Sequence, residues 1–563
     1  MPIATRHIGP APLSAAAEQH MVPMRDGVEL ATDVYLPASP DRCPTVLVRL
    51  PYDKNSRYCF MEQIAAQFTA RGYATVVQDV RGKFRSQGET EPFVTESDDG
   101  YDTIEWITQQ QWSDAVVGMC GDSYFGFTQW AAVTSGHPAL KAIVPRVTSM
   151  ELAVVVPRWH PERIVTLYGA EYLADYWASR DIVYTPIDYD RRPVLEAFEE
   201  AFSASGSRSA AFDSCVPHPQ PAEPYPRGHP FQAPPVATLH GVGWFDNLLG
   251  ESMRDYTAMA AHLAWGPLTY LHADSIDHEN NQLAHAPVQP ENDHSTDDAA
   301  LRRTVAHYVA PVLEFFDVFL KEEQPVEALP RVRWHLGHGG FRTSTSWPPP
   351  RAREMVLYLA EPESAVRDAH GGSLRAHQEA PADPPRAVRW THDPRDLVPS
   401  VTGDPFSALR EWVDESELQS RSDVLTFTAA PVSTPLDLAG PVRAELTVDS
   451  TAPGMHLFAK LFDVFPDGTA HMLVRGQAVL PPHGGGADVG PAEIDLGHTG
   501  YRIRPGHRLR LQLACSDFPH YLWHPGTEEN PWLAARGRPS TQTLFLGGGL
   551  PGQVWITVLG TEE

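Results

Sequence analysis

Short apolar runs and longer amphipathic segments alternate over about the first 145 residues of the chain. Residues 45–50 and 74–80 are rich in β-branched side chains, which is typical of buried strands. Between them, residues 61–72 carry apolar side chains at helical spacing and end in Gly72, a residue that favours helix termination. The same alternation continues through residues 101–147. Strands that alternate with helices predict a mostly parallel sheet that is covered on both faces.

The pattern changes twice further along the chain. Residues 149–235 mix helix-like segments, such as 194–205, with proline-rich stretches, and this predicts a helical cap inserted into the α/β domain. The α/β pattern resumes over residues 236–345, which we expect to complete the domain begun by residues 1–148. Residues 346–563 alternate apolar and polar side chains with period two between glycine and proline turns. This alternation predicts that residues 346–563 form a β-sandwich of the jelly-roll kind.

Composition limits the number of domains and the kinds of partner that the protein can have. The chain has 563 residues and is 42% apolar, which is enough for two or three domains. Its formal net charge of −27 argues against a nucleic-acid partner. No segment approaches 18 consecutive apolar residues and the N-terminus lacks a signal-like apolar run, so we predict a cytoplasmic protein without a membrane span. The five cysteines are few and widely spaced, which predicts buried free thiols. The sequence indicates no cofactor or metal, and it leaves open whether the protein forms a homo-oligomer.

Ser123 lies between a predicted strand and a predicted helix, in the stretch GMCGDSYFGFTQW. A nucleophilic serine on such a turn is flanked by glycines because the turn is strained and crowded. The usual spacing is G-x-S-x-G, whereas here Phe125 takes the second glycine's place and Gly126 follows it. From the residues alone, Ser123 is either a nucleophile or an ordinary serine in a loop of small residues.

A serine nucleophile needs a general base and a carboxylate that orients the base. Asp246 directly follows an apolar strand, where it would lie at the carboxyl edge of the sheet; alternatively, it caps a helix that begins at Asn247. His278 comes at the end of the next apolar run, in a polar loop, and is the preferred base. His272 lies inside that run and is held in reserve.

The reaction also requires donors for the oxyanion. The backbone N–H of Tyr124 is one candidate, because it follows the serine at the start of the helix. The phenol of Tyr52, directly after the strand at residues 45–50, is the second candidate. The alternative interpretation makes Tyr52 a surface residue in a turn after Pro51.

Six stretches of the chain together resemble the CocE/NonD hydrolases, a family that includes cocaine esterase, X-Pro dipeptidyl-peptidases, α-amino-acid ester hydrolases and glutaryl-cephalosporin acylases. They are VLVRLPYDK, GYATVVQDVRGKFRSQGE, GMCGDSYFGFTQW, GWFDNLLGES, AKLFDVFPDG and SDFPHYLWHPGT. The resemblance runs from about Val22 to the end of the chain and is weakest across the cap. It implies an α/β fold, namely an α/β-hydrolase domain with an inserted helical cap and a C-terminal jelly roll.

The resemblance also implies roles for individual residues. The family's nucleophile lies in G-x-S-Y-x-G, so the late second glycine is the family's own form and Ser123 is the implied nucleophile. Tyr52 would bind the oxyanion and Asp246 would orient the base. The family's G-P-W-x-H motif is absent around the histidine, and matching strand to strand selects His278, with His272 in reserve. Asp79 and Arg81 would brace the loop around the site.

We therefore predict a serine hydrolase that cleaves an ester or amide of a small-molecule, aminoacyl or short-peptide substrate through an acyl-enzyme. The alternatives are an acyltransferase or cyclase that uses the same intermediate, an X-Pro dipeptidyl-peptidase, and an inactive binding protein. Two other stretches are not assigned a function, one because of its position in the chain and the other because of its residue spacing. HGGG at residues 483–486 lies too late for an oxyanion loop, and the histidine-rich and acidic stretch at residues 272–294 lacks metal-ligand spacing.

Overall fold

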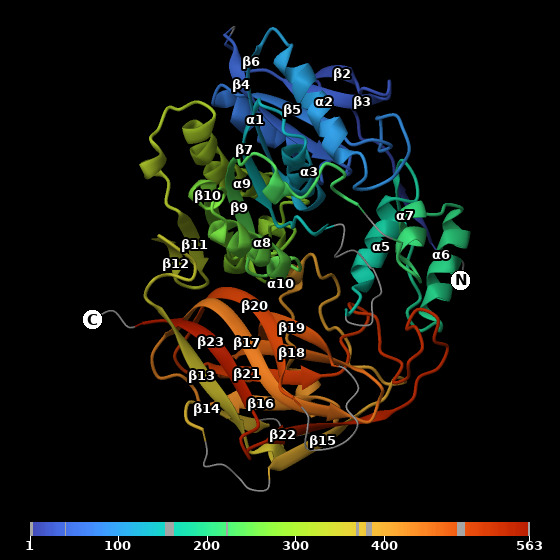
Figure 1. Ribbon diagram of the computed structural model, residues 1–563, viewed down its shortest axis with the longest axis vertical. Helices are drawn as coiled ribbons and strands as arrows, with labels where there is room; N and C mark the ends of the chain where they lie inside the picture. Colours follow the sequence, from blue (N-terminus) through green and yellow to red (C-terminus); the bar gives the residue numbers. More distant parts are fainter. Residues whose placement is uncertain are drawn as a thin grey trace.

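A mostly parallel sheet of ten strands forms the centre of the N-terminal part of the molecule (Figure 1). The computed structural model describes residues 4–39, 41–152, 163–220, 223–366, 371–378, 385–480 and 490–560. The strand order in the sheet is β12-β11-β10-β9-β7-β6-β4-β5-β3-β2. The bounds of these strands are β2 (Glu18–Pro23), β3 (Glu29–Tyr35), β4 (Cys43–Leu50), β5 (Ala74–Asp79), β6 (Ser113–Asp122), β7 (Leu140–Arg146), β9 (Ala237–Gly243), β10 (Thr269–Asp274), β11 (Val332–Leu336) and β12 (Gly340–Ser344).

The seven strands from β5 to β11 run parallel, and antiparallel strands close both edges. The parallel strands are buried along nearly their whole length, as expected for a sheet covered on both faces. The chain reverses direction across the sheet between β5 and β6. The covering helices are α1 (Met61–Ala70), α2 (Glu96–Thr108), α3 (Ser123–Thr134), α8 (Leu249–Ala261) and α9 (Asp298–Phe319).

The cap lies between β7 and β9 in the sequence and beside both other parts of the molecule in space (Figure 1). Its described elements are α5 (Leu167–Tyr176), β8 (Ile182–Tyr184), α6 (Val194–Ser205) and α7 (Ala210–Cys215). The N-terminal strand β1 (Arg6–Ile8) pairs with β8, and backbone hydrogen bonds join Val165 and Leu167, at the start of α5, to Leu522 and His520 of the C-terminal half. The cap is thus tied to the N-terminus and to the C-terminal half.

The C-terminal half is the β-rich domain that the period-two pattern predicted. Its long strand β17 (Leu436–Ser450) pairs with three others. Alternate residues of β15 and β22 are buried, because one face of each strand contacts an apolar core. The remaining strands are β13 (Ala352–Ala360), β14 (Gly372–Arg375), β15 (Arg386–His392), β16 (Leu425–Ala429), β18 (Met455–Val464), β19 (Ala470–Leu480), β20 (Ala492–Ile503), β21 (Arg508–Ala514), β22 (Ser540–Leu546) and β23 (Gly552–Leu559), and one short helix, α10 (Ala408–Glu411), precedes β16.

Several smaller predictions can be compared with the fold. All five cysteines are buried and free, as predicted. Among the described residues, no helix has the length and apolar character that a membrane span requires. The HGGG stretch at residues 483–486 lies outside the described residues.

Candidate active site

Ser123 occupies a strained turn where β6 ends and α3 begins. Its φ is +53°, a left-handed backbone conformation that is uncommon for a residue with a side chain. Gly121, two residues earlier, has φ of +147°, and a Cβ added there would lie 2.1 Å from the Phe125 ring. Only glycine fits at position 121, because the turn brings the helix back over the strand.

Gly126 is required by a different neighbour. A Cβ at this position would lie 2.5 Å from the Thr148 side chain. Thr148 in turn donates a hydrogen bond from Oγ1 to the carbonyl oxygen of Ser123 at 2.6 Å. The second glycine therefore lets Thr148 approach and hold the turn, while Phe125 packs on Gly121 in the usual place of that glycine.

His278 and Asp246 form a buried hydrogen-bonded pair. His278 Nδ1 lies 2.7 Å from Asp246 Oδ1, and both side chains are almost fully enclosed. The His278 ring and Ser123 line the same cavity. The capping role considered for Asp246 is wrong, because α8 begins at Leu249 and its N-cap, Leu248, has no side-chain cap.

The charge on Asp246 decides the proton affinity of His278. Burial works against the charged imidazolium and is the largest single effect, but the charge of Asp246 and its hydrogen bond oppose it. With smaller contributions from Glu279 and Asp122, they raise the pKa of His278 to about 9. A protonated His278 is therefore strongly stabilised, as a base that must take a proton during the reaction requires.

Tyr52 points its hydroxyl into the same cavity, so its interpretation as a surface turn residue is wrong. The side chain is buried, and its hydroxyl lies 3.4 Å from that of Tyr172 on α5. Burial raises the pKa of Tyr52, and hydrogen bonding with Tyr172 and Ser123 offsets this only in part, so the phenol keeps its proton. Tyr124 is the second residue of α3, and its N–H is among the four that have no acceptor within a helix. Two donors thus lie beside Ser123.

Buried charges hold the loop that carries Tyr52. Lys54 Nζ lies 2.9 Å from Asp33 and 3.8 Å from Asp79, and all three side chains are fully buried. The backbone N–H of Lys54 also donates to Asp79 at 2.8 Å. Asp79 thus braces the loop, in keeping with the sequence interpretation, whereas Arg81 pairs further away with Asp26 and Asp99.

A polar network that the sequence did not indicate joins the serine turn to the histidine loop. Asp122, directly before Ser123, accepts hydrogen bonds from Asn280 and Tyr308, both at 2.9 Å. Arg146 lies 3.3 Å from Asp122 and donates to Asn280 at 2.8 Å. Because these residues come from four distant segments, only the fold brings them together.

The C-terminal half also reaches the histidine loop. The Phe406 ring packs edge-on against His278 with 5.1 Å between ring centroids, and the Phe406 carbonyl accepts from the Glu279 N–H at 3.2 Å. Asp277 accepts hydrogen bonds from the N–H groups of Asn281 and Leu409 at 2.9 and 3.0 Å. Neither Phe406 nor Leu409 carried a signal in the sequence.

His272, the reserve base, lies elsewhere. It sits within β10 and stacks on Phe341 with 5.5 Å between centroids. Burial lowers its pKa to about 3. Its partners differ from those of His278, and it does not line the cavity that contains Ser123.

The cavity has a volume of about 650 Å³ and collects side chains from all three parts of the molecule. Aromatic rings and four carboxylates dominate its wall. These residues are Tyr52, Tyr58, Tyr168, Tyr172, Tyr176, Tyr184, Phe406, Glu171, Asp175, Glu279 and Asp404. Within the described part of the chain, no group of three or more His, Cys, Asp or Glu side chains is arranged to hold a metal ion.

The fold and this geometry define a serine hydrolase of the α/β-hydrolase class. Comparison with known proteins specifies the family. Residues 26–278 match the X-Pro dipeptidyl-peptidase (S15 family) and residues 324–554 match the X-Pro dipeptidyl-peptidase C-terminal non-catalytic domain. Cocaine esterase from Rhodococcus sp. (strain MB1 Bresler) is 31% identical over 552 residues, covering 90% of this chain and 92% of that protein. The chain therefore belongs to the S15 family of serine hydrolases, which confirms the family resemblance seen in the sequence.

Solved structures share the complete architecture. An aminopeptidase from a marine sediment archaeon, Thaumarchaeota archaeon, has a TM-score of 0.77 at 23% identity and covers 97% of this chain and 96% of its own. An α-amino acid ester hydrolase has a TM-score of 0.76 at 24% identity, with 97% and 98% covered. These likenesses establish the common fold.

The pH dependence of turnover tests the Asp246–His278 pair. Because a general base must be neutral, kcat/KM should rise with pH with its midpoint near the pKa of about 9, rather than near the ordinary histidine value of 6.5. Asp246→Asn removes the charge that stabilises imidazolium, so the midpoint should move to lower pH while the rate falls. A profile of kcat/KM from about pH 5 to about pH 10 measures both effects. A midpoint near 6.5 that Asp246→Asn leaves in place would contradict this account.

Proposed function

We propose that this hydrolase cleaves esters or amides through an acyl-enzyme on Ser123. One observation supports this most: Ser123, the phenol of Tyr52 and the Asp246-bound His278 all line one cavity. A nucleophile, a base with its orienting carboxylate and an oxyanion donor are the parts that acyl transfer requires.

The proposed reaction has two steps, acylation of Ser123 and hydrolysis of the acyl-enzyme, which use the same groups. His278 takes the hydroxyl proton of Ser123 while Oγ bonds to the carbonyl carbon, and the oxyanion accepts hydrogen bonds from the Tyr52 hydroxyl and the Tyr124 N–H. His278 then gives its proton to the leaving alcohol or amine as the carbon–heteroatom bond breaks. Water repeats the attack on the acyl-enzyme with the same groups, and the acid leaves as Ser123 regains its proton. Asp246 keeps the imidazole oriented throughout.

The carboxylates of the cavity favour a cationic substrate. None of Glu171, Asp175, Glu279 and Asp404 has an ion-pair partner among the described residues. Burial, reinforced by Glu171, raises the pKa of Asp175 to about 8. A ligand ammonium would favour the ionised form of Asp175, because an adjacent cation stabilises the ionised carboxylate.

The arginines of the cavity wall do not cancel this charge. Arg57 pairs with Asp298 at 2.7 Å and Arg410 pairs with Asp293 at 2.5 Å. The tyrosine faces of α5 add favourable surfaces for an organic cation. We therefore propose that the substrate is an ester or amide that carries a protonated amine. The terminal ammonium of a short peptide presents the same group, so X-Pro dipeptidyl-peptidase activity is the second candidate.

Tyr52→Phe tests the oxyanion site. Loss of one donor should lower kcat by about 10²-fold or more with little change in KM, because the hydrogen bond strengthens only as charge develops. Ser123→Ala sets the background rate, and Tyr270→Phe, a buried tyrosine outside the cavity, is the matched control. Steady-state kinetics on an activated ester measure the effect. Near-parental kcat in folded Tyr52→Phe would remove this residue from the mechanism.

Asp175→Asn tests the cationic substrate. The enzyme should prefer methyl 2-amino-2-phenylacetate over methyl phenylacetate, and the substitution should reduce that preference by about tenfold or more, since hydrogen bonds to charged groups are strong. Asp190→Asn, an exposed change in the cap outside the cavity, should leave the preference as it is. The ratio of kcat/KM for the two esters is the measurement. An undiminished preference in Asp175→Asn, or none in the parent, would contradict the proposal.

A further inference from the structure

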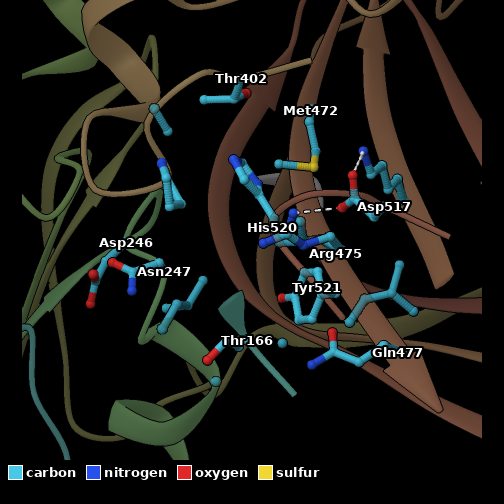
Figure 2. Close-up of a pocket in the computed structure, with 18 of the residues that line it drawn as sticks. Thr166, Asp246, Asn247, Thr402, Met472, Arg475, Gln477, Asp517, His520 and Tyr521 are labelled. Carbon is cyan, nitrogen blue, oxygen red and sulfur yellow. Dashed lines mark hydrogen bonds and ion pairs between the residues drawn. The ribbon is translucent and has the colours of Figure 1, made fainter. Parts of the chain in front are cut away.

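A second cavity of about 670 Å³ lies between the α/β-hydrolase domain and the β-rich domain. Figure 2 shows Asp246 and Asn247 on one side of it and His520, Tyr521 and Arg475 on the other. The mechanism above uses Asp246 alone among these residues. The cavity therefore requires a separate explanation.

The second cavity adjoins the catalytic one on the side of His278. Four residues line both cavities, namely Thr166, Tyr168, Asn247 and Pro405. Asn247 directly follows Asp246, the partner of His278. Pro405 directly precedes Phe406, whose ring packs on His278. The shared wall is thus formed by the neighbours of the base.

The proposed reaction fixes which part of a substrate lies on that side. His278 must deliver its proton to the leaving-group atom, so the leaving group has to be next to the imidazole. A leaving group longer than a few atoms would therefore extend past Asn247 and Pro405 toward the second cavity.

Four buried charged side chains in the wall of the second cavity formed by the β-rich domain pair with one another. Lys460 lies 2.9 Å from Glu415 and 3.2 Å from Asp517, and Arg475 lies 2.7 Å from Asp517. Two cations thus face two carboxylates, and this wall offers no surplus charge. An ionic ligand would have to break these buried pairs, which is costly.

Neutral hydrogen-bonding groups remain only partly satisfied. Among the described residues no side chain hydrogen-bonds to the His520 ring, which is only 6% exposed, and its contact with the Thr402 backbone falls short of good hydrogen-bond geometry. The side-chain oxygen of Asn247 is likewise buried without a partner. Burial lowers the pKa of His520 to about 4, so its neutral ring offers one donor and one acceptor. Buried polar groups are nearly always satisfied, by solvent or ligand where protein atoms do not serve.

We propose that the second cavity is a leaving-group subsite that receives a neutral polar alcohol or amine portion, of amide character, through hydrogen bonds to His520 and Asn247. This inference rests on the proposed function, because it takes its direction from proton delivery by His278. It extends the substrate class to esters and amides whose leaving group is long and polar.

Two 2-amino-2-phenylacetyl esters of equal leaving-group length, which carry the amine of the proposed substrate, test the subsite. One carries N-acetylethanolamine, which has an amide, and the other carries pentanol, which is apolar. In His520→Phe, which keeps a ring of similar size, the ratio of kcat/KM for the amide ester over the pentyl ester should fall by about fivefold, since a neutral hydrogen bond is lost. His524→Phe, in the same C-terminal segment but outside both cavities, should keep the parental ratio.

Each outcome bears on the subsite. A fall in the ratio confined to His520→Phe supports it. An unchanged ratio in His520→Phe overturns it, whether both rates hold or both fall equally, because an equal fall shows a structural role. A parental enzyme that cleaves neither ester would overturn the proposed function and this inference with it, whereas cleavage of both with an unchanged ratio would overturn the subsite alone.

Discussion

The left-handed backbone of Ser123 is the constraint on which the rest of the site depends. A φ of +53° at the junction of β6 and α3 lifts the serine from the sheet and starts the helix directly behind it. Such a conformation costs of order 1–3 kcal/mol and persists only where the surroundings enforce it. Here Gly121 makes room for Phe125, and Thr148 binds the Ser123 carbonyl. The strain places the Ser123 hydroxyl on the cavity wall, at the N-terminus of α3, where the first backbone N–H groups have no acceptor within the helix.

The same turn is connected to the base by polar contacts. Asp122 sits one residue before the serine and binds Asn280, two residues after His278. Arg146 contacts both residues of this pair. Because these contacts are buried, a displacement of either loop would leave charged or amide groups unpaired, which is costly. The turn that carries Ser123 and the loop that carries His278 are therefore held in a fixed position relative to each other.

The β-rich domain takes part in this arrangement although the matching family region is described as non-catalytic. Phe406 packs on His278, and the Leu409 N–H binds Asp277 next to it. The cap supplies Tyr172, whose hydroxyl meets that of Tyr52. The cavity is thus assembled from the hydrolase sheet, the cap and the β-rich domain, and its shape requires all three to pack together.

Local patterns in the sequence predicted the elements whose burial repeats regularly. The helix at residues 194–205 has the predicted bounds, and the strands predicted at 45–50 and 74–80 are neighbouring parallel strands inside the sheet. The positions of Asp246 and His278 after consecutive strands predicted that they would meet at one sheet edge. The edge strands β2 and β3 were missed, and so was the pairing of β1 with the cap.

The remaining features depend on contacts between distant segments. The need for Gly126 becomes clear only when Thr148 is seen against it. The burial of Tyr52 depends on α5 of the cap, which no pattern around residue 52 contains. In the sequence, Phe406 is an ordinary aromatic residue in a polar segment, and its contact with His278 is evident only in the fold. No periodicity encodes such contacts, because they are made by the packing of whole domains.

Labelling with a fluorophosphonate probe, followed by peptide mass spectrometry, tests the central claim most directly, because the probe reacts with an activated serine and needs no knowledge of the substrate. We expect a single adduct on Ser123 that is lost in His278→Ala and retained in His272→Ala. An adduct on another serine, no adduct on the folded protein, or labelling that depends on His272 instead of His278 would contradict it.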